Sequence, residues 1–249
     1  EGFVPWTWWP SDEVGHTDEA AKEMKAIFGT QSVFDTAKPV RLLRRVIEIG
    51  LPEDGIVLDF FAGSGTIGHA VAAQNAEDGH RRRFIAVQLP ETSSGAKFDK
   101  VSEITVARLE YVMANFSGAR DQGLKAFRLE SSNFIAGDEG GEGELNLSDH
   151  TLREADADVW AVAAEIFLRE GVSLDAPWTE HAFGDVVVEV AGGVAVVVGS
   201  KLTDATVDEV FGLNPRSVVF LEDDLAGKDA IKANAFTNAR NRGITMKTV

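Results

Sequence analysis

The spacing of apolar residues in the first half of the chain predicts alternating helices and strands. Apolar residues recur three or four positions apart, as on one face of a helix, in the segments 18–28, 40–47, 66–74 and 101–116. Short apolar runs predict strands over 56–60, 83–89 and 125–129. The strand–helix–strand order is typical of a parallel sheet with a right-handed crossover. The polar residues 75–80 are expected to form the loop that follows the helix.

The second half shows a pattern of its own. Two valine-rich runs, 186–190 and 194–198, flank the turn residues Ala191-Gly192-Gly193 and predict a β-hairpin. Around this hairpin we expect an amphipathic segment over 152–169, helices over 203–211 and 228–241, and strands over 217–221 and 244–249. The pattern predicts a small α/β domain.

An acidic, glycine-rich stretch separates the two halves. Residues 137–144 read GDEGGEGE and contain no apolar residue that could be buried. We therefore expect a linker over 136–150, a first domain over 1–135 and a second domain over 151–249.

Composition and charge narrow the class of protein. The chain has 249 residues and no cysteine, which excludes disulfides, thiolate metal sites and cysteine nucleophiles. Its net charge is −16, with 15 Lys and Arg against 19 Asp and Glu up to Ile135 and 9 against 21 after it. Duplex-binding surfaces are basic, so we expect the main DNA-gripping surface to lie elsewhere. Without a membrane-spanning run or a signal peptide, the expected location is the cytoplasm, with no membrane partner.

The strongest chemical signal is a small-residue turn between a predicted strand and helix. Residues 59–66 read DFFAGSGT. Gly63 and Gly65 permit close approach of the backbone to a ligand, while Ser64 and Thr66 offer hydroxyl groups. Gln88 or Glu91, at the end of the next strand, could hydrogen-bond a ribose. The pattern favours S-adenosylmethionine as the ligand.

Two other interpretations of this turn stay open on the residues alone. Residues 63–68 also satisfy Gly-x-Gly-x-x-Gly, the fingerprint of NAD(P)-binding domains. That fingerprint expects an acidic residue where Gln88 stands, although Arg81 to Arg83 would suit a 2′-phosphate. The remaining interpretation is a glycine turn that binds no ligand.

A family resemblance favours the methyl donor. Residues 59–66 resemble motif I of DNA amino-methyltransferases, and residues 34–39 resemble their motif X, in the order of the β group. Four further segments resemble the modification (Mod) subunit of type III restriction–modification systems: 12–17, 83–91, 127–134 and 232–249.

The resemblance implies a Rossmann-like, S-adenosylmethionine-binding portion of an adenine-N6 methyltransferase, followed by a small α/β C-terminal domain. It implies a restriction subunit as partner, and it leaves a homodimer open. No metal site is implied. The cofactor-binding residues that it implies are Phe34, Lys38, Asp59, Phe60, Phe61, Gly63, Ser64, Gly65, Thr66 and Gln88.

The catalytic tetrapeptide of that family, Asp/Asn-Pro-Pro-aromatic, is missing, since no two of the seven prolines are adjacent. With Glu1 rather than Met at the start, this predicts a piece of a longer protein. We therefore expect no catalytic residue here and no methylation by this chain alone, with DNA bound through an absent upstream portion. The alternative from another class is a non-catalytic module that docks to a sister subunit.

Several conspicuous side chains have simpler interpretations. Trp6, Trp8 and Trp9 are expected to be hydrophobic anchors of a segment whose partner strands lie upstream, rather than base-stacking groups. We expect His69 to be packed or half-exposed, and residues 81–83 to form a solvated turn. Lys38 is expected either to contact the carboxylate of the cofactor or to lie in solvent at the start of a helix. Asp59 is expected to pair with the cofactor's amino group rather than to cap the turn.

Overall fold

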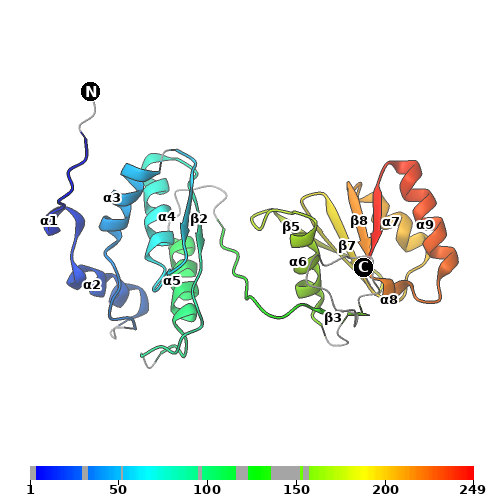
Figure 1. The fold of residues 1–249 in the computed structure, drawn as a ribbon, viewed down its shortest axis with the longest axis horizontal. Helices are drawn as coiled ribbons and strands as arrows, with labels where there is room; N and C mark the ends of the chain where they lie inside the picture. Colours follow the sequence, from blue (N-terminus) through cyan, green and yellow to red (C-terminus); the bar gives the residue numbers. More distant parts are fainter. Residues whose placement is uncertain are drawn as a thin grey trace, which may run out of the picture. The chain divides into compact units, whose positions relative to one another are not determined.

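The computed structural model describes residues 4–29, 33–51, 53–94, 97–115, 123–135, 152–153 and 157–249. The chain divides into two compact units, Glu1–Ala126 and Phe127–Val249, coloured blue to green and green to red in Figure 1. Each unit combines helices with a β-sheet, which confirms the predicted α/β class.

The first unit is built around two short parallel strands. These are β1 (Ile56–Asp59) and β2 (Arg83–Ala86), paired in register from Ile56 and Arg83 onward. The helices are α1 (Ser11–Val14), α2 (Thr17–Phe28), α3 (Val40–Gly50), α4 (Thr66–Asp78) and α5 (Val101–Asn115). α4 connects the two strands and packs against β2, while α3 and α5 pack against α4 (Figure 1).

The predicted loop over 75–80 is wrong over residues 75–78, because α4 continues to Asp78. Asn75 lies inside the helix and is 3% exposed. Its side chain donates to the Arg82 carbonyl oxygen at 2.9 Å and accepts from the Arg82 N–H at 3.1 Å. These two hydrogen bonds therefore tie the last turns of α4 to Arg82, the residue that precedes β2.

One face of the two-stranded sheet is covered and the other is open. Val57 and Phe84 pack with apolar residues of α3 and α4. Side chains alternate between the two faces of a strand. The alternate residues and their continuations beyond the strands form what we call the open face: Ile56, Leu58, Phe60, Ile85, Val87 and Leu89, all between 47% and 63% exposed. Parallel sheets are normally covered on both faces.

The second unit contains a five-stranded mixed sheet in the order β5-β6-β7-β8-β9. Its strands are β5 (Trp178–Phe183), β6 (Val186–Ala191), β7 (Val194–Val198), β8 (Ser217–Phe220) and β9 (Thr245–Thr248). The pairs β7–β8 and β8–β9 are parallel and the others antiparallel. The expected hairpin is therefore confirmed as β6 and β7, whereas β5 was not predicted.

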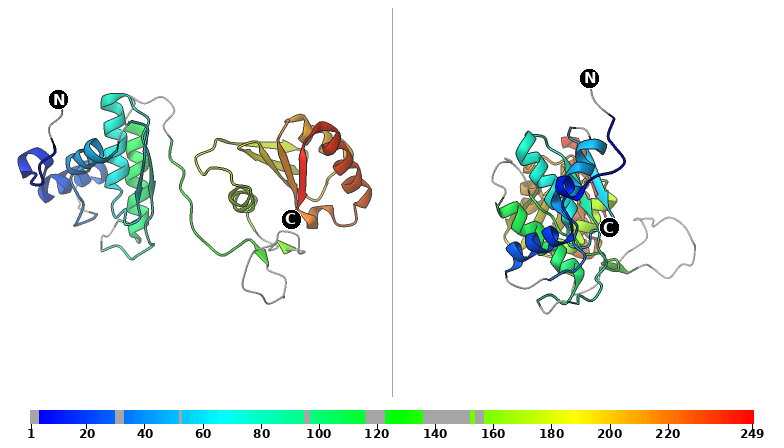
Figure 2. Two further views of the ribbon diagram at one scale, coloured as in Figure 1. Left: turned by 45° about the horizontal axis from the view of Figure 1, so that its top comes forward. Right: turned by 90° about the vertical axis from the view of Figure 1, so that its left-hand side faces the viewer.

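Helices cover both faces of this sheet. They are α6 (Val159–Arg169), α7 (Asp204–Gly212), α8 (Glu222–Leu225) and α9 (Asp229–Arg242). Val162 and Ile166 of α6 pack on one face, with Val194 and Val196. α7 and α9 cover the other face, where Val210 of α7 and Ala235 of α9 pack in one apolar cluster with Val197 of β7. Figure 2 shows α6 end-on, across the sheet from α9.

The boundary between the units differs from the predicted one. Residues 136–150, the predicted linker, lie outside the described residues. Residues 127–134 group with the second unit, where a two-residue strand, β3 (Phe134–Ile135), pairs with β4 (Leu152–Arg153). Glu165 of α6 accepts hydrogen bonds from the Asn133 N–H at 2.8 Å and the Ser132 hydroxyl at 2.6 Å. The strand predicted over 125–129 is wrong, since these residues have no regular secondary structure.

Candidate functional site

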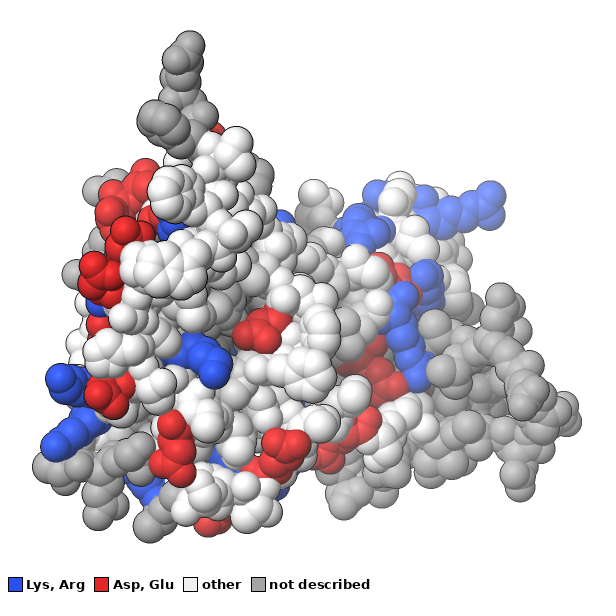
Figure 3. Space-filling model, turned by 60° about the vertical axis from the view of Figure 1, so that its left-hand side comes forward, with Lys and Arg blue, Asp and Glu red and all other residues white. Residues whose placement is uncertain are grey.

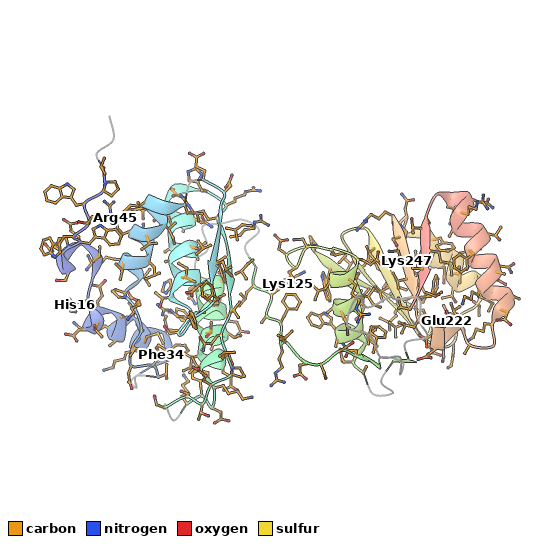
Figure 4. All side chains as sticks on the ribbon, in the orientation of Figure 1. His16, Phe34, Arg45, Lys125, Glu222 and Lys247 are labelled. Atoms are coloured by element: carbon orange, nitrogen blue, oxygen red, sulfur yellow. The ribbon has the colours of Figure 1, made fainter. Side chains whose placement is uncertain are left out.

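The glycine turn lies between β1 and α4, at the carboxyl ends of both parallel strands. Gly63 and Gly65 have φ values of 53° and 75°, in the left-handed region that glycine adopts without strain. The turn is closed by the Gly65 N–H, which donates to the Ala62 carbonyl oxygen at 2.8 Å. A Cβ built on Gly63 would lie 3.4 Å from Cζ of Phe34, so the ring of Phe34 packs on the turn. Figure 4 labels Phe34 in the first unit.

Gln88 connects the two strand ends. The Gly63 N–H donates to its Oε1 at 2.7 Å, and its Nε2 donates to the Leu89 carbonyl oxygen at 3.1 Å. The structure therefore places Gln88 beside the turn, as the sequence suggested for a ribose partner. Both of these hydrogen bonds occupy amide atoms that a ribose would otherwise use.

The hydroxyl groups of the turn point inward. Ser64 and Thr66 are 2% and 6% exposed, and their side-chain oxygens lie 3.2 Å apart. The expectation that these hydroxyls are offered to a ligand is not met in this structure. Any contact of these two residues with a ligand on the outer side of the turn would come from their backbone.

Arg108 of α5 binds these hydroxyls and was not predicted. It is 0% exposed, and its Nη1 donates to Ser64 Oγ at 3.0 Å and to Thr66 Oγ1 at 2.9 Å. Burial lowers the pKa of Arg108 to about 10, so the guanidinium is charged at neutral pH. The sequence does carry a signal, because Arg108 stands four residues from both Ile104 and Val112, on the apolar face of a helix.

His69 and Glu23 complete this buried polar cluster. Nη2 of Arg108 lies 3.2 Å from Nδ1 of His69 and 3.6 Å from Oε2 of Glu23. Burial, and secondarily the charge of Arg108, lower the pKa of His69 to about 4, so the imidazole is neutral and accepts. Burial also raises the pKa of Glu23, against the opposing effects of the Val40 N–H and Arg108. His69 is thus half-buried, as expected.

Three of the remaining predicted site residues, Asp59, Phe60 and Phe61, lead into the turn. Oδ1 of Asp59 accepts from the Phe61 N–H at 3.0 Å, so in this structure the carboxylate caps the turn. Phe60 and Phe61 are 63% and 80% exposed, with ring centroids 5.1 Å apart. Lys38 is exposed just before α3.

One expectation outside the turn stays a prediction and another needs correction. Trp6 and Trp8 are 79% and 73% exposed, as side chains that anchor the segment on upstream strands would be. Arg82 is buried rather than solvated, and its Nη1 lies 2.8 Å from Oδ2 of Asp78. The triple-arginine segment is therefore not a uniformly solvated turn.

The surface carries acidic and basic side chains scattered among uncharged ones on the face drawn in Figure 3. Among the described residues, no group of three or more His, Asp or Glu could hold a metal ion. Within the same residues, no helix is both long and apolar enough to cross a bilayer.

Comparison with known proteins gives a family match within this first unit and several similar proteins. Residues 5–94 match the DNA methylase family. The type III restriction-modification enzyme StyLTI Mod subunit of Salmonella typhimurium is 40% identical over 129 residues, 47% of this chain and 20% of that subunit. The type II methyltransferase M.KpnI of Klebsiella pneumoniae is 40% identical over 43% of the chain and 27% of its own length. The EcoPI Mod subunit of Escherichia phage P1 is 34% identical over 55% of the chain and 22% of that subunit.

These matches confirm that the chain is similar to type III modification subunits. Each matched region spans only about a fifth to a quarter of the relative. The relatives are therefore several times longer than the region that they share with this chain.

Proposed function

We propose that this chain is the S-adenosylmethionine-binding portion of a DNA adenine-N6 methyltransferase similar to type III modification subunits. The observation that carries the proposal is the glycine turn at the carboxyl ends of two adjacent parallel strands, where ligands of open α/β sheets bind. The DNA methylase match over residues 5–94 includes this turn and the Phe34 segment that packs on it. In this proposal the first unit is a Rossmann-like cofactor domain.

The residues around the turn fit such a cofactor. Gly63 leaves room for the methionine part to approach the backbone, whereas Gly65 lets the turn pack closely against Thr105 of α5. Asp59 offers a carboxylate for the amino group of the cofactor. Gln88 would bind the ribose after exchanging its hydrogen bond with the Gly63 N–H. Phe34 would pack across the bound molecule. The cofactor supplies an activated methyl group, and these side chains orient it.

We propose that the groups that hold the target adenine come from another part of a longer protein. The chain has no Asp/Asn-Pro-Pro-aromatic loop, and methyl transfer needs the amine held in line with the methyl group. The open face supports this proposal, because an exposed apolar face on a parallel sheet needs a cover. The net charge of −16 agrees with a duplex-binding surface elsewhere.

The second unit is then a small α/β C-terminal domain for docking, with a restriction subunit as the proposed partner and the homodimer still open. One observation favours the rival function of a non-catalytic docking module. The Gly63 N–H, which a cofactor at this turn would use, already donates to Gln88 Oε1. The two proposals differ in whether the chain binds the cofactor at all.

Calorimetric titration of the full chain with S-adenosylmethionine and S-adenosylhomocysteine separates them. We expect binding by the wild type and none by Gly63→Val, whose side chain fills the approach to the turn. Gly79→Val is the matched control, because Gly79 also has a positive φ of 78° but ends α4 at its far end. No heat or thermal shift with either compound at millimolar concentration would refute cofactor binding by this chain. Tritium transfer to duplex DNA should be absent with the isolated chain.

A further inference from the structure

The inward side of the glycine turn is held by one face of α5. Thr105 Oγ1 donates to the Gly63 carbonyl oxygen at 2.6 Å, and Arg108 Nη1 donates to Ser64 and Thr66 at 3.0 and 2.9 Å. Thr105 and Arg108 are three positions apart, so they project from the same side of the helix. Two side chains of one helix thus bind three of the four residues 63–66.

The same guanidinium reaches a second segment through Glu23. Nη2 of Arg108 lies 3.6 Å from Oε2 of Glu23, whose two oxygens each accept from the Val40 N–H at 3.3 Å. Val40 is the first residue of α3, directly after the segment that carries Phe34. A continuous polar chain therefore runs from the start of α3, through Glu23 and Arg108, to the glycine turn.

Stability alone does not account for a charge at this position. Taking a guanidinium out of water is costly, and apolar residues of similar volume often stabilise a core at least as well as buried ions. Arg108 is 0% exposed, and its closest hydrogen-bond partners are neutral oxygens of the turn. A planar group with five donors in a rigid fork does, however, orient several acceptors at once, whereas the three donors of a lysine ammonium rotate freely.

We propose that Arg108 is a positioning residue that, with Glu23, sets the spacing between the Phe34 segment and the glycine turn. These two segments pack on each other at the candidate cofactor site, so the buried pair shapes the site without touching the ligand. The inference rests on the proposed function for the identity of the ligand. The geometry that it predicts for the turn is independent of that function.

The test uses Arg108→Met and Arg108→Lys in the full chain, with Arg82→Met as the matched control. Arg82 is also a buried arginine of the first unit, but it pairs with Asp78 at the opposite ends of α4 and β2. The first measurement is amide hydrogen exchange of residues 63–66 without cofactor. Since each lost hydrogen bond to a charged donor is worth about tenfold or more, we expect exchange at least ~10-fold faster in Arg108→Met. Arg108→Lys should be intermediate, and Arg82→Met should leave the turn unchanged.

The second measurement is affinity for S-adenosylhomocysteine, which we expect to be about 10-fold weaker in Arg108→Met by the same reasoning. Should Arg108→Met not fold, Arg108→Lys and Glu23→Gln carry both measurements, since Glu23→Gln keeps an acceptor for Val40 but removes the charge. Unchanged exchange in the turn, or equal effects in Arg82→Met, would overturn the positioning role. If the turn responds as expected but the wild type binds no cofactor, the positioning role stands and the proposed function fails. If the wild type binds and Arg108→Met binds equally well, the positioning role is wrong.

Discussion

His69 should make the stability of the first unit depend on pH. Its imidazole lies half-buried on α4 and accepts from the charged Arg108 of α5, and Glu23 of α2 faces the same guanidinium. Burial and Arg108 lower the pKa of His69 from 6.5 to about 4. Above the ordinary value, both the folded and the unfolded chain hold a neutral imidazole. Between the two values only the unfolded chain binds the proton, so stability is lost as the pH falls.

The size of this effect follows from the shift. One pKa unit corresponds to about 1.4 kcal/mol, so a change from 6.5 to about 4 gives an upper limit of roughly 3 kcal/mol lost by about pH 4. Because the ring is only half-buried, solvent screening reduces this, and we expect about 1 to 3 kcal/mol. That is a large part of the stability of a small domain.

The perturbation is His69→Gln, which keeps a neutral acceptor for Arg108 and removes the titration. Urea unfolding of the full chain is followed through amide signals of α4, so that the first unit is observed separately, at several pH values between about 7 and about 4.5. The free energy of unfolding of the wild type should fall relative to that of the variant as the pH decreases. Glu23 titrates in both proteins, so its contribution cancels in the difference. A difference that is independent of pH would refute the reasoning, as would protonation of His69 near its ordinary pKa.

Two further predictions concern the second unit. Burial, and then the facing Glu180 on β5, raise the pKa of Glu189, so the wild type loses stability as the pH rises above the ordinary pKa of a carboxyl group. Glu189→Gln should therefore unfold at a higher temperature than the wild type at pH 7 but not at low pH. Equal melting curves of the two proteins at pH 7 would contradict this prediction. Residues 127–249 expressed alone should melt several degrees above residues 151–249, because the shorter piece lacks the buried Phe134 and leaves Glu165 without Asn133. Identical melting temperatures of the two pieces by circular dichroism would show that 127–134 do not belong to this unit.

Local spacing determined much of this fold. The period of apolar residues predicted α2, α3, α5 and the β6–β7 hairpin close to their observed bounds, because these elements form from neighbouring residues. It failed for β5, whose Trp178–Phe183 run has exposed polar residues and becomes a strand by pairing with β6. It also failed for the short apolar run 125–129, which forms no strand.

The candidate site divides in the same way. The glycine turn follows from local residues, since Gly63 and Gly65 stand where the backbone turns left-handed, and the strand pattern places Gln88 at the neighbouring strand end. The inward direction of the Ser64 and Thr66 hydroxyls, in contrast, depends on long-range packing. The reason is Arg108, which lies 44 and 42 residues away along the chain and meets these oxygens only after α5 has packed beside α4. The direction of a side chain in a turn depends on which distant group satisfies its hydrogen bonds, and local sequence does not contain that group.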